Sequence, residues 1–166
     1  MNHFHTPILF AALALGANLA AAADSPESFL KDAIEDSRAE VQVSQLALQK
    51  SQNPEVKQFA QRMIKDHTAL NQRIESLAQN KHVKLPDGTS LGEKATYEKL
   101  AHTSDSFDKD YMDHNVSDHQ DDVKKFSLQA AEGKDPEIKS FAAETVPKFR
   151  EHLKLAEALD AKVKQH

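Results

Sequence analysis

The chain contains nearly the same eight-residue segment twice, and this repeat constrains its fold more than any other feature. The two copies are NPEVKQFA at 53–60 and DPEIKSFA at 135–142. Asn53 and Asp135 are favoured N-cap residues, and the proline after each occupies the first helical position, where a missing backbone N–H costs nothing. Each copy therefore predicts a helix start that closely follows the end of an earlier helix. The repeated unit is a helical hairpin, and two hairpins predict four long helices.

Apolar residues recur in steps of three and four along the predicted helices, a spacing typical of helical bundles. We expect helices at about 26–51, 54–82, 104–132 and 136–164. The connection between the second and third helices has room for a short helix at about 91–101 and is long enough to run the length of a bundle. These features predict an all-α, ferritin-like up-down-down-up four-helix bundle with a long crossover.

Composition and charge favour one helical domain and argue against a nucleic-acid partner. The 166 residues include 4 Gly and no Cys, and 28% of them are charged, a balance that suits helices better than sheets. The formal net charge is −5, and acidic and basic residues are interleaved. No basic stripe is present that could bind a phosphate backbone, so we expect no nucleic-acid binding.

The N-terminal segment predicts export. It contains an apolar run of roughly sixteen residues that ends near Ala23, shorter than the roughly twenty residues of a membrane span. Ala20 and Ala22 suit a signal peptidase site. We therefore predict a secretory signal peptide at 1–23, cleaved after Ala22 or Ala23, and a single periplasmic domain at 24–166 without a transmembrane segment. An uncleaved anchor is the alternative, and the absence of cysteine excludes a lipid anchor.

Several short phrases occur in a fixed order along the chain: NPEVKQFAQRMIKDH, FDKDY at 107–111, KDPEIKSFA and REHL at 150–153. With these phrases the chain resembles, from about Ser28 to Leu159, the bacterial family known as domain of unknown function 4142, whose members carry the label of predicted outer-membrane proteins. The resemblance implies a ferritin-like four-helix bundle in the cell envelope, with no established activity.

Four polar residues fall at one depth of the predicted bundle: Glu40, His67, His119 and His152. Counting helix rise from the two hairpin turns places each of them roughly 20–25 Å from its turn, and each helix contributes one. Three imidazoles and a carboxylate are suitable ligands for one ion of Zn, Cu, Fe or Ni. On the first helix we take the row of residues that contains Val41 as the main core-facing row. Glu40 belongs to the neighbouring row. The sequence thus predicts a central metal layer.

The same layer has a second interpretation, in which buried polar groups only fix the register of the helices in a structural or partner-binding envelope module. A redox metalloenzyme is a further alternative. Di-iron enzymes use Glu-x-x-His, but Ile64 and Phe149 stand three residues before His67 and His152, so ferroxidase chemistry is not implied. No Ser-His-Asp set or phosphate-binding loop is present, and we favour a protein without catalysis. Protein partners remain open.

Two further groups on the third helix are candidates with simpler explanations. Asp108 and Tyr111 match a Phe-Asp-x-x-Tyr phrase of the family, and we expect Asp108 to serve the helix dipole and Tyr111 to pack. The helix also carries an acidic cluster, most of which we expect to form a solvated face, with weak binding of divalent cations as the alternative. The cluster comprises Asp113, His114, Asp118, Asp121 and Asp122.

Overall fold

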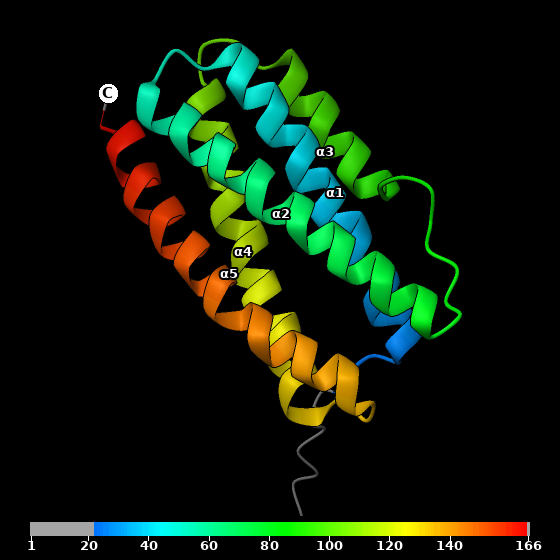
Figure 1. Ribbon diagram of the computed structural model, residues 1–166. Helices are drawn as coiled ribbons and strands as arrows, with labels where there is room; N and C mark the ends of the chain where they lie inside the picture. The colour runs from blue at the N-terminus through cyan, green and yellow to red at the C-terminus, as the bar shows by residue number, and fades with distance from the viewer. Residues whose placement is uncertain (1–21, 166) are drawn as a thin grey trace, which may run out of the picture.

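The computed structural model describes residues 22–165, and within that range the chain forms five helices and no strand. The helices are α1 (Pro26–Lys50), α2 (Pro54–Asn80), α3 (Leu91–His102), α4 (Phe107–Glu132) and α5 (Pro136–Val163) (Figure 1). The prediction of an all-α chain is confirmed. The predicted signal peptide lies outside the described residues except for its last two, Ala22 and Ala23, and stays a prediction.

Side-chain caps mark where α1, α2, α3 and α5 begin, whereas α4 has no side-chain cap hydrogen bond. The Asn53 side chain accepts a hydrogen bond from the backbone N–H of Glu55 at 2.9 Å, and the Asp135 carboxylate accepts two from the first turn of α5. Ser25 caps α1 and Ser90 caps α3 in the same way. Because each cap follows closely on the end of the preceding helix, α1–α2 and α4–α5 fold back as tight hairpins.

The two hairpins pack against each other to form the body of the molecule. α1 packs along α2 and α4 along α5, while α3 lies beside α1 (Figure 1). Figure 1 also shows that the α1–α2 turn and the α4–α5 turn lie at opposite ends. The segment after α2 leads back along the outside of α1 to α3, so that α2 and α4 run in the same direction.

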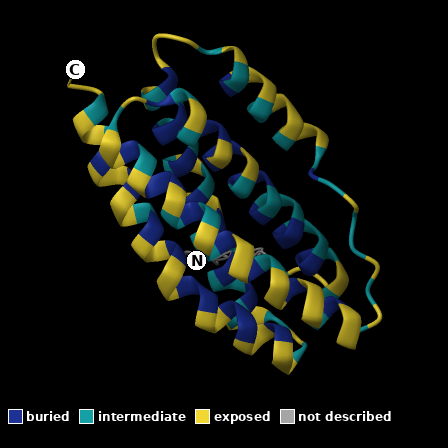
Figure 2. Cartoon of the chain, turned by 45° about the horizontal axis from the view of Figure 1, so that its top comes forward, coloured by how far each residue is buried: buried dark blue, intermediate teal, exposed yellow. Residues whose placement is uncertain are grey.

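The apolar core is divided into two clusters, one toward each end of the molecule. One contains Phe29, Ile34, Ile74, Phe126, Phe141 and Phe149 among others. The other contains Val43, Phe59, Met63, Tyr111, Met112 and Leu159 among others. In Figure 2 the buried residues lie on the helix faces that turn toward other helices. On all four long helices the stretch between the two clusters carries buried polar side chains, Glu40 and the three histidines among them.

Helix α1 corrects one detail of the sequence prediction. Glu40 is buried with 1% of its surface exposed, whereas Val41 is only half-buried. The row we took as the main core-facing row is therefore the less buried one at this level. The reason is that α1 contacts α4 as well as α2 and α3, so its buried face is broad and includes Glu40.

No helix among the described residues combines the length and the hydropathy needed to cross a membrane.

Candidate metal centre

Three histidines from three helices meet in the polar layer between the apolar clusters. His67 on α2, His119 on α4 and His152 on α5 have at most 1% of their surface exposed. Their ring centroids are 5.2 to 5.7 Å apart, and one ring nitrogen of each lies within 4.8 Å of one from each of the others. We call these residues the histidine triad. The triad can supply three nitrogen ligands to one ion.

One nitrogen of each ring is already held by a neighbouring group. His152 Nε2 lies 2.9 Å from Asp66 Oδ2, and His119 Nδ1 lies 2.9 Å from the backbone oxygen of Asn115. His67 Nδ1 lies 3.1 Å from the hydroxyl of Ser37, and that hydroxyl donates its proton to the backbone oxygen of His67. The Asp66 carboxylate and the Asn115 carbonyl can only accept hydrogen bonds. The Ser37 hydroxyl, whose own hydrogen is donated to the His67 carbonyl, also acts as an acceptor toward His67 Nδ1. Each of these three nitrogens therefore carries a hydrogen.

The other nitrogen of each ring is buried without any hydrogen-bond partner. These atoms are Nε2 of His67, Nε2 of His119 and Nδ1 of His152. Since a neutral imidazole has one N–H and one lone pair, each free nitrogen carries a lone pair. This is the arrangement found around protein-bound metals, where the second nitrogen of a ligating histidine donates to an oxygen and thereby fixes the ring.

Burial keeps the three rings neutral. It lowers the pKa of His67 to about 3 and the pKa of His152 to about 4, in spite of nearby carboxylates. Burial also lowers the pKa of His119, although the charge of Glu40 acts in the opposite direction. At neutral pH the lone pairs are therefore available for a metal, and no proton has to be displaced.

A groove between α2 and α5 borders two of the three histidines. It has a volume of about 250 Å³, and its lining includes His67 and His152 together with Asp66, Thr145 and Lys148. The Arg73 and Glu144 side chains, which form an ion pair at 2.8 Å, also line it. We call this the triad groove. It brings the surface close to two of the three histidines.

Glu40 does not join the triad. Its carboxylate instead lies within 4.8 Å of a carboxylate oxygen of Asp118 and a ring nitrogen of His119. The predicted layer of four thus divides into two groups that share His119. His114 Nε2 lies 3.0 Å from Glu40 Oε1, in an ion pair without hydrogen-bond geometry. Burial alone would raise the pKa of Glu40, but His114, together with His119 and His67, outweighs burial and lowers this pKa to about 2.

The acidic cluster of α4 is not mainly a solvated face, and that prediction is wrong. Asp122 is buried and His114 and Asp118 are largely covered, while Asp121 is exposed. Burial and the charge of Asp122 raise the pKa of Asp118 well above its ordinary value. The physical reason is that α4 packs against α1 and α3 as well as α5, so a larger part of its circumference is covered than its apolar stripe indicates.

Asp108 and Tyr111 lie away from the triad. The Tyr111 ring is fully buried in the cluster around Phe59 and Met63, and its hydroxyl lies 2.8 Å from the hydroxyl of Ser44. Packing of Tyr111 is confirmed. Asp108 stands in the first turn of α4, where a negative charge suits the helix dipole.

Sequence reasoning missed the three groups that hold the histidines: Ser37, Asp66 and Asn115. Asn115 stands one turn before His119, so its carbonyl was predictable from helix geometry. Asp66 directly precedes His67 but contacts His152 on α5 instead. Only the packing of α2 against α5 reveals that contact. The contact of Ser37 with His67 likewise becomes visible only when α1 packs against α2.

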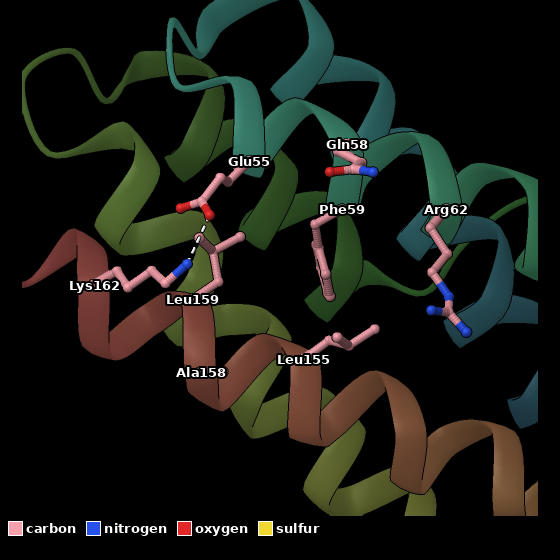
Figure 3. Close-up of a pocket in the computed structure, with 8 residues that line it drawn as sticks. All are labelled: Glu55, Gln58, Phe59, Arg62, Leu155, Ala158, Leu159 and Lys162. Atoms are coloured by element: carbon pink, nitrogen blue, oxygen red, sulfur yellow. Dashed lines mark hydrogen bonds and ion pairs between the residues drawn. The ribbon is translucent and has the colours of Figure 1, made fainter.

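A second groove between α2 and α5 lies closer to the α1–α2 turn and contains no residue of the triad (Figure 3). Its volume is about 370 Å³. Phe59 and Leu155 line its middle, and Glu55 and Lys162 form an ion pair at 2.6 Å across one end. This groove is mainly apolar and is separate from the metal centre.

Comparison with known proteins gives a family and one similar fold. The model of the family described as "Domain of unknown function (DUF4142)" matches residues 12–159. The solved structure of CopM in the Cu(II)-bound form superposes with a TM-score of 0.72 at 18% sequence identity, over 84% of this chain and 98% of that chain. At this identity the likeness shows a shared fold. No curated protein sequence matches the chain.

Proposed function

The chain belongs to the DUF4142 family, and we propose that this member binds one transition-metal ion, with copper as the preferred ion, through His67, His119 and His152. The proposed role is binding, without catalysis. The proposed place is the periplasm, which the chain reaches through the signal peptide predicted at 1–23.

The observation that carries the proposal is the set of three buried ring nitrogens without partners. Leaving a buried polar group unsatisfied costs roughly 1–3 kcal/mol. Three such atoms in one place therefore lower the folding stability of a chain in which they serve only for packing. Protonation does not relieve the cost, because burial lowers the pKa of all three rings. An ion that accepts the three lone pairs relieves it.

Two observations favour copper. Imidazole suits Zn, Cu, Fe and Ni, and among divalent ions of the first row a given set of ligands binds Cu(II) most tightly. The protein of similar fold, CopM, is described in a Cu(II)-bound form, which supports testing copper first. The triad groove supports an open fourth position, because His67 and His152 line it.

The finer architecture also belongs to this proposal. We take the molecule as a ferritin-like up-down-down-up bundle whose two hairpins are related by a pseudo-twofold axis. The helix directions in Figure 1 support it, since the two hairpin turns lie at opposite ends. Such folds commonly hold metal ligands on facing helices in the centre of the bundle.

A structural register layer is the second candidate. It is favoured by the bond between His119 Nδ1 and the Asn115 carbonyl, which needs no metal to hold the ring. In that case nothing is bound, and replacement of a histidine by leucine leaves the stability unchanged or raises it. A redox metalloenzyme is the third candidate, and turnover of oxygen or peroxide by the loaded chain is its test.

The proposal is tested with mature chain purified without an affinity tag. We expect about one copper ion per wild-type chain, and a rise of about 2.7 kcal/mol in the free energy of unfolding when free copper is one hundred times Kd. His119→Leu should lose both effects, and the control His102→Gln, at an exposed position, should keep them. Absence of bound metal from the wild type, with stability unchanged in His119→Leu, contradicts the proposal and supports the register layer.

A further inference from the structure

The second group of ligands, on the α1–α4 side of His119, is the strongest unexplained feature of the molecule. We propose that Glu40, Asp118 and His119 form a second cation position, which takes harder divalent ions such as Mn²⁺ and shares His119 with the histidine triad. One oxygen or nitrogen of each residue lies within 4.8 Å of those of the other two. We call this group the carboxylate position. It goes beyond the copper binding proposed above.

The atoms of the carboxylate position are buried and lack hydrogen-bond partners. Both oxygens of Glu40, Oδ2 of Asp118 and Nε2 of His119 share this property. Glu40 has 1% of its surface exposed and His119 has none. Oε1 of Glu40 lies 3.0 Å from His114 Nε2, but the other three atoms have no polar partner, and buried oxygens and nitrogens normally have one, which indicates a missing ligand. All four atoms are able to accept, which makes that ligand a cation or a donor.

Charge balance also indicates a cation. The group contains two carboxylates, and His114 forms an ion pair with Glu40. No residue of the described range forms an ion pair with Asp118. Two turns further along α4, Lys125 is engaged by Asp36 and does not pair with Asp118. Burial and the charge of Asp122 raise the pKa of Asp118, and a cation between Glu40 and Asp118 would favour its ionised form.

The two positions differ in the ions that they suit. The carboxylate position offers two oxygens and one nitrogen, and carboxylate ligands suit hard ions such as Mn²⁺. The histidine triad offers three nitrogens, which suit copper. The chain therefore presents a harder and a softer set of ligands that share one imidazole.

His119 cannot serve both positions at once. Its Nδ1 donates to the Asn115 carbonyl, which leaves a single lone pair on Nε2. One lone pair binds one ion, so occupation of the triad removes the nitrogen ligand from the carboxylate position. The structure thus assigns a competition between copper and Mn²⁺ within a single layer of the bundle.

The test uses the mature chain, two ions, three ligand variants and one control variant. Binding of Mn²⁺ is followed by loss of the electron paramagnetic resonance signal of the free ion, and binding of Cu²⁺ by competition with a chelator. We expect Asp118→Asn to weaken Mn²⁺ binding about tenfold or more, because it removes a charged ligand, and to leave Cu²⁺ binding unchanged. His152→Leu should do the reverse, and His119→Leu should lose both ions.

Asp121→Asn is the matched control, because Asp121 lies on the same helix but is exposed. It should bind both ions as the wild type does. In the wild type, addition of one equivalent of Cu²⁺ should release Mn²⁺. Circular dichroism establishes that each variant folds, and Glu40→Gln replaces Asp118→Asn in the test if the latter does not.

The two proposals fail separately. If Mn²⁺ does not bind, or if Asp118→Asn and Asp121→Asn weaken its binding equally, the carboxylate position is wrong, whatever copper does. If Mn²⁺ binds as expected but Cu²⁺ does not release it, the sharing of His119 is wrong. If Cu²⁺ binding is unaffected by His152→Leu while Mn²⁺ binding depends on Asp118, the copper proposal fails and the carboxylate position stands.

Discussion

The Asp66 carboxylate, on α2, lies 2.9 Å from Nε2 of His152, on α5, and determines which nitrogen of that ring is free. Burial alone would raise the pKa of Asp66, but the hydrogen bond from His152 and the nearby charges of Lys148 and Arg62 together outweigh burial, and this pKa is lowered. The carboxylate is therefore ionised at neutral pH and accepts the Nε2 hydrogen. The lone pair of His152 is left on Nδ1, which has no partner. A surface-accessible acid thus prepares a buried ligand.

The first prediction concerns Asp66→Ala. We expect the affinity for copper to fall about 10- to 100-fold, the usual effect of removing the partner of a ligating histidine, because His152 loses both its orientation and its fixed tautomer. Competition titration against a copper chelator measures the affinity. Glu144→Ala is the control, since Glu144 also lines the triad groove but contacts no histidine. An equal loss in both variants would mean that the negative charge of the triad groove, and not the orientation of His152, determines the affinity for copper.

The second prediction concerns Tyr111, a residue of the family phrase that we assign to packing. Tyr111→Phe removes the hydroxyl that lies 2.8 Å from the hydroxyl of Ser44. We expect the free energy of unfolding to fall by about 1 kcal/mol, the typical net value of one buried hydrogen bond, with copper affinity unchanged. Urea unfolding and the same chelator titration measure the two quantities. A large fall in affinity would instead assign Tyr111 to the site.

The third prediction concerns pH and the metal-free chain. The folded pKa values of His67 and His152 are about 3 and about 4, below the value near 6.5 of an exposed histidine. The unfolded chain therefore binds protons that the folded chain does not. The stability that results is complete above about pH 6.5 and is lost as the pH falls toward the folded pKa values, by up to about 1.4 kcal/mol per pH unit for each histidine.

Urea unfolding at a series of pH values measures this slope. His67→Leu should reduce the slope, because it removes one of the two groups, and His102→Gln should leave it unchanged, because His102 is exposed. If the slope between about pH 6.5 and about pH 5 is the same in all three proteins, His67 does not titrate as described.

The fourth prediction concerns export. Because the apolar N-terminal run is short and ends in small residues, we expect the protein in the cell envelope to begin at Ala23 or Asp24. N-terminal sequencing of the envelope fraction determines the first residue. Protein that still begins at Met1 would support the uncleaved anchor.

The helices were the predictable part of the fold, because their signals are local. An N-cap residue followed by proline marks the starts of α2 and α5 within a few positions of the chain, whatever surrounds them. Helix rise then places His67, His119 and His152 at one depth, since depth depends only on distance from a turn.

The division of the central layer was not predictable from the sequence, because it depends on rotation about the helix axes and on neighbours. Helix rise gives the height of Glu40 but not whether it faces His67 or Asp118. Burial of Asp118 and Asp122 depends on α3 and α1 covering that side of α4, which no periodicity within α4 reveals. The contact between Asp66 and His152 likewise exists only because α2 and α5 pack together.

X-ray absorption at the copper edge tests the central claim most directly, on mature chain loaded with one equivalent of copper. We predict a signal from three imidazoles with metal–nitrogen distances of about 2.0–2.1 Å, as for other imidazole sites. His67→Leu should reduce the signal to two imidazoles, and His102→Gln should leave three. A spectrum with one imidazole or none, or one that stays the same in His67→Leu, would contradict a metal centre formed by His67, His119 and His152.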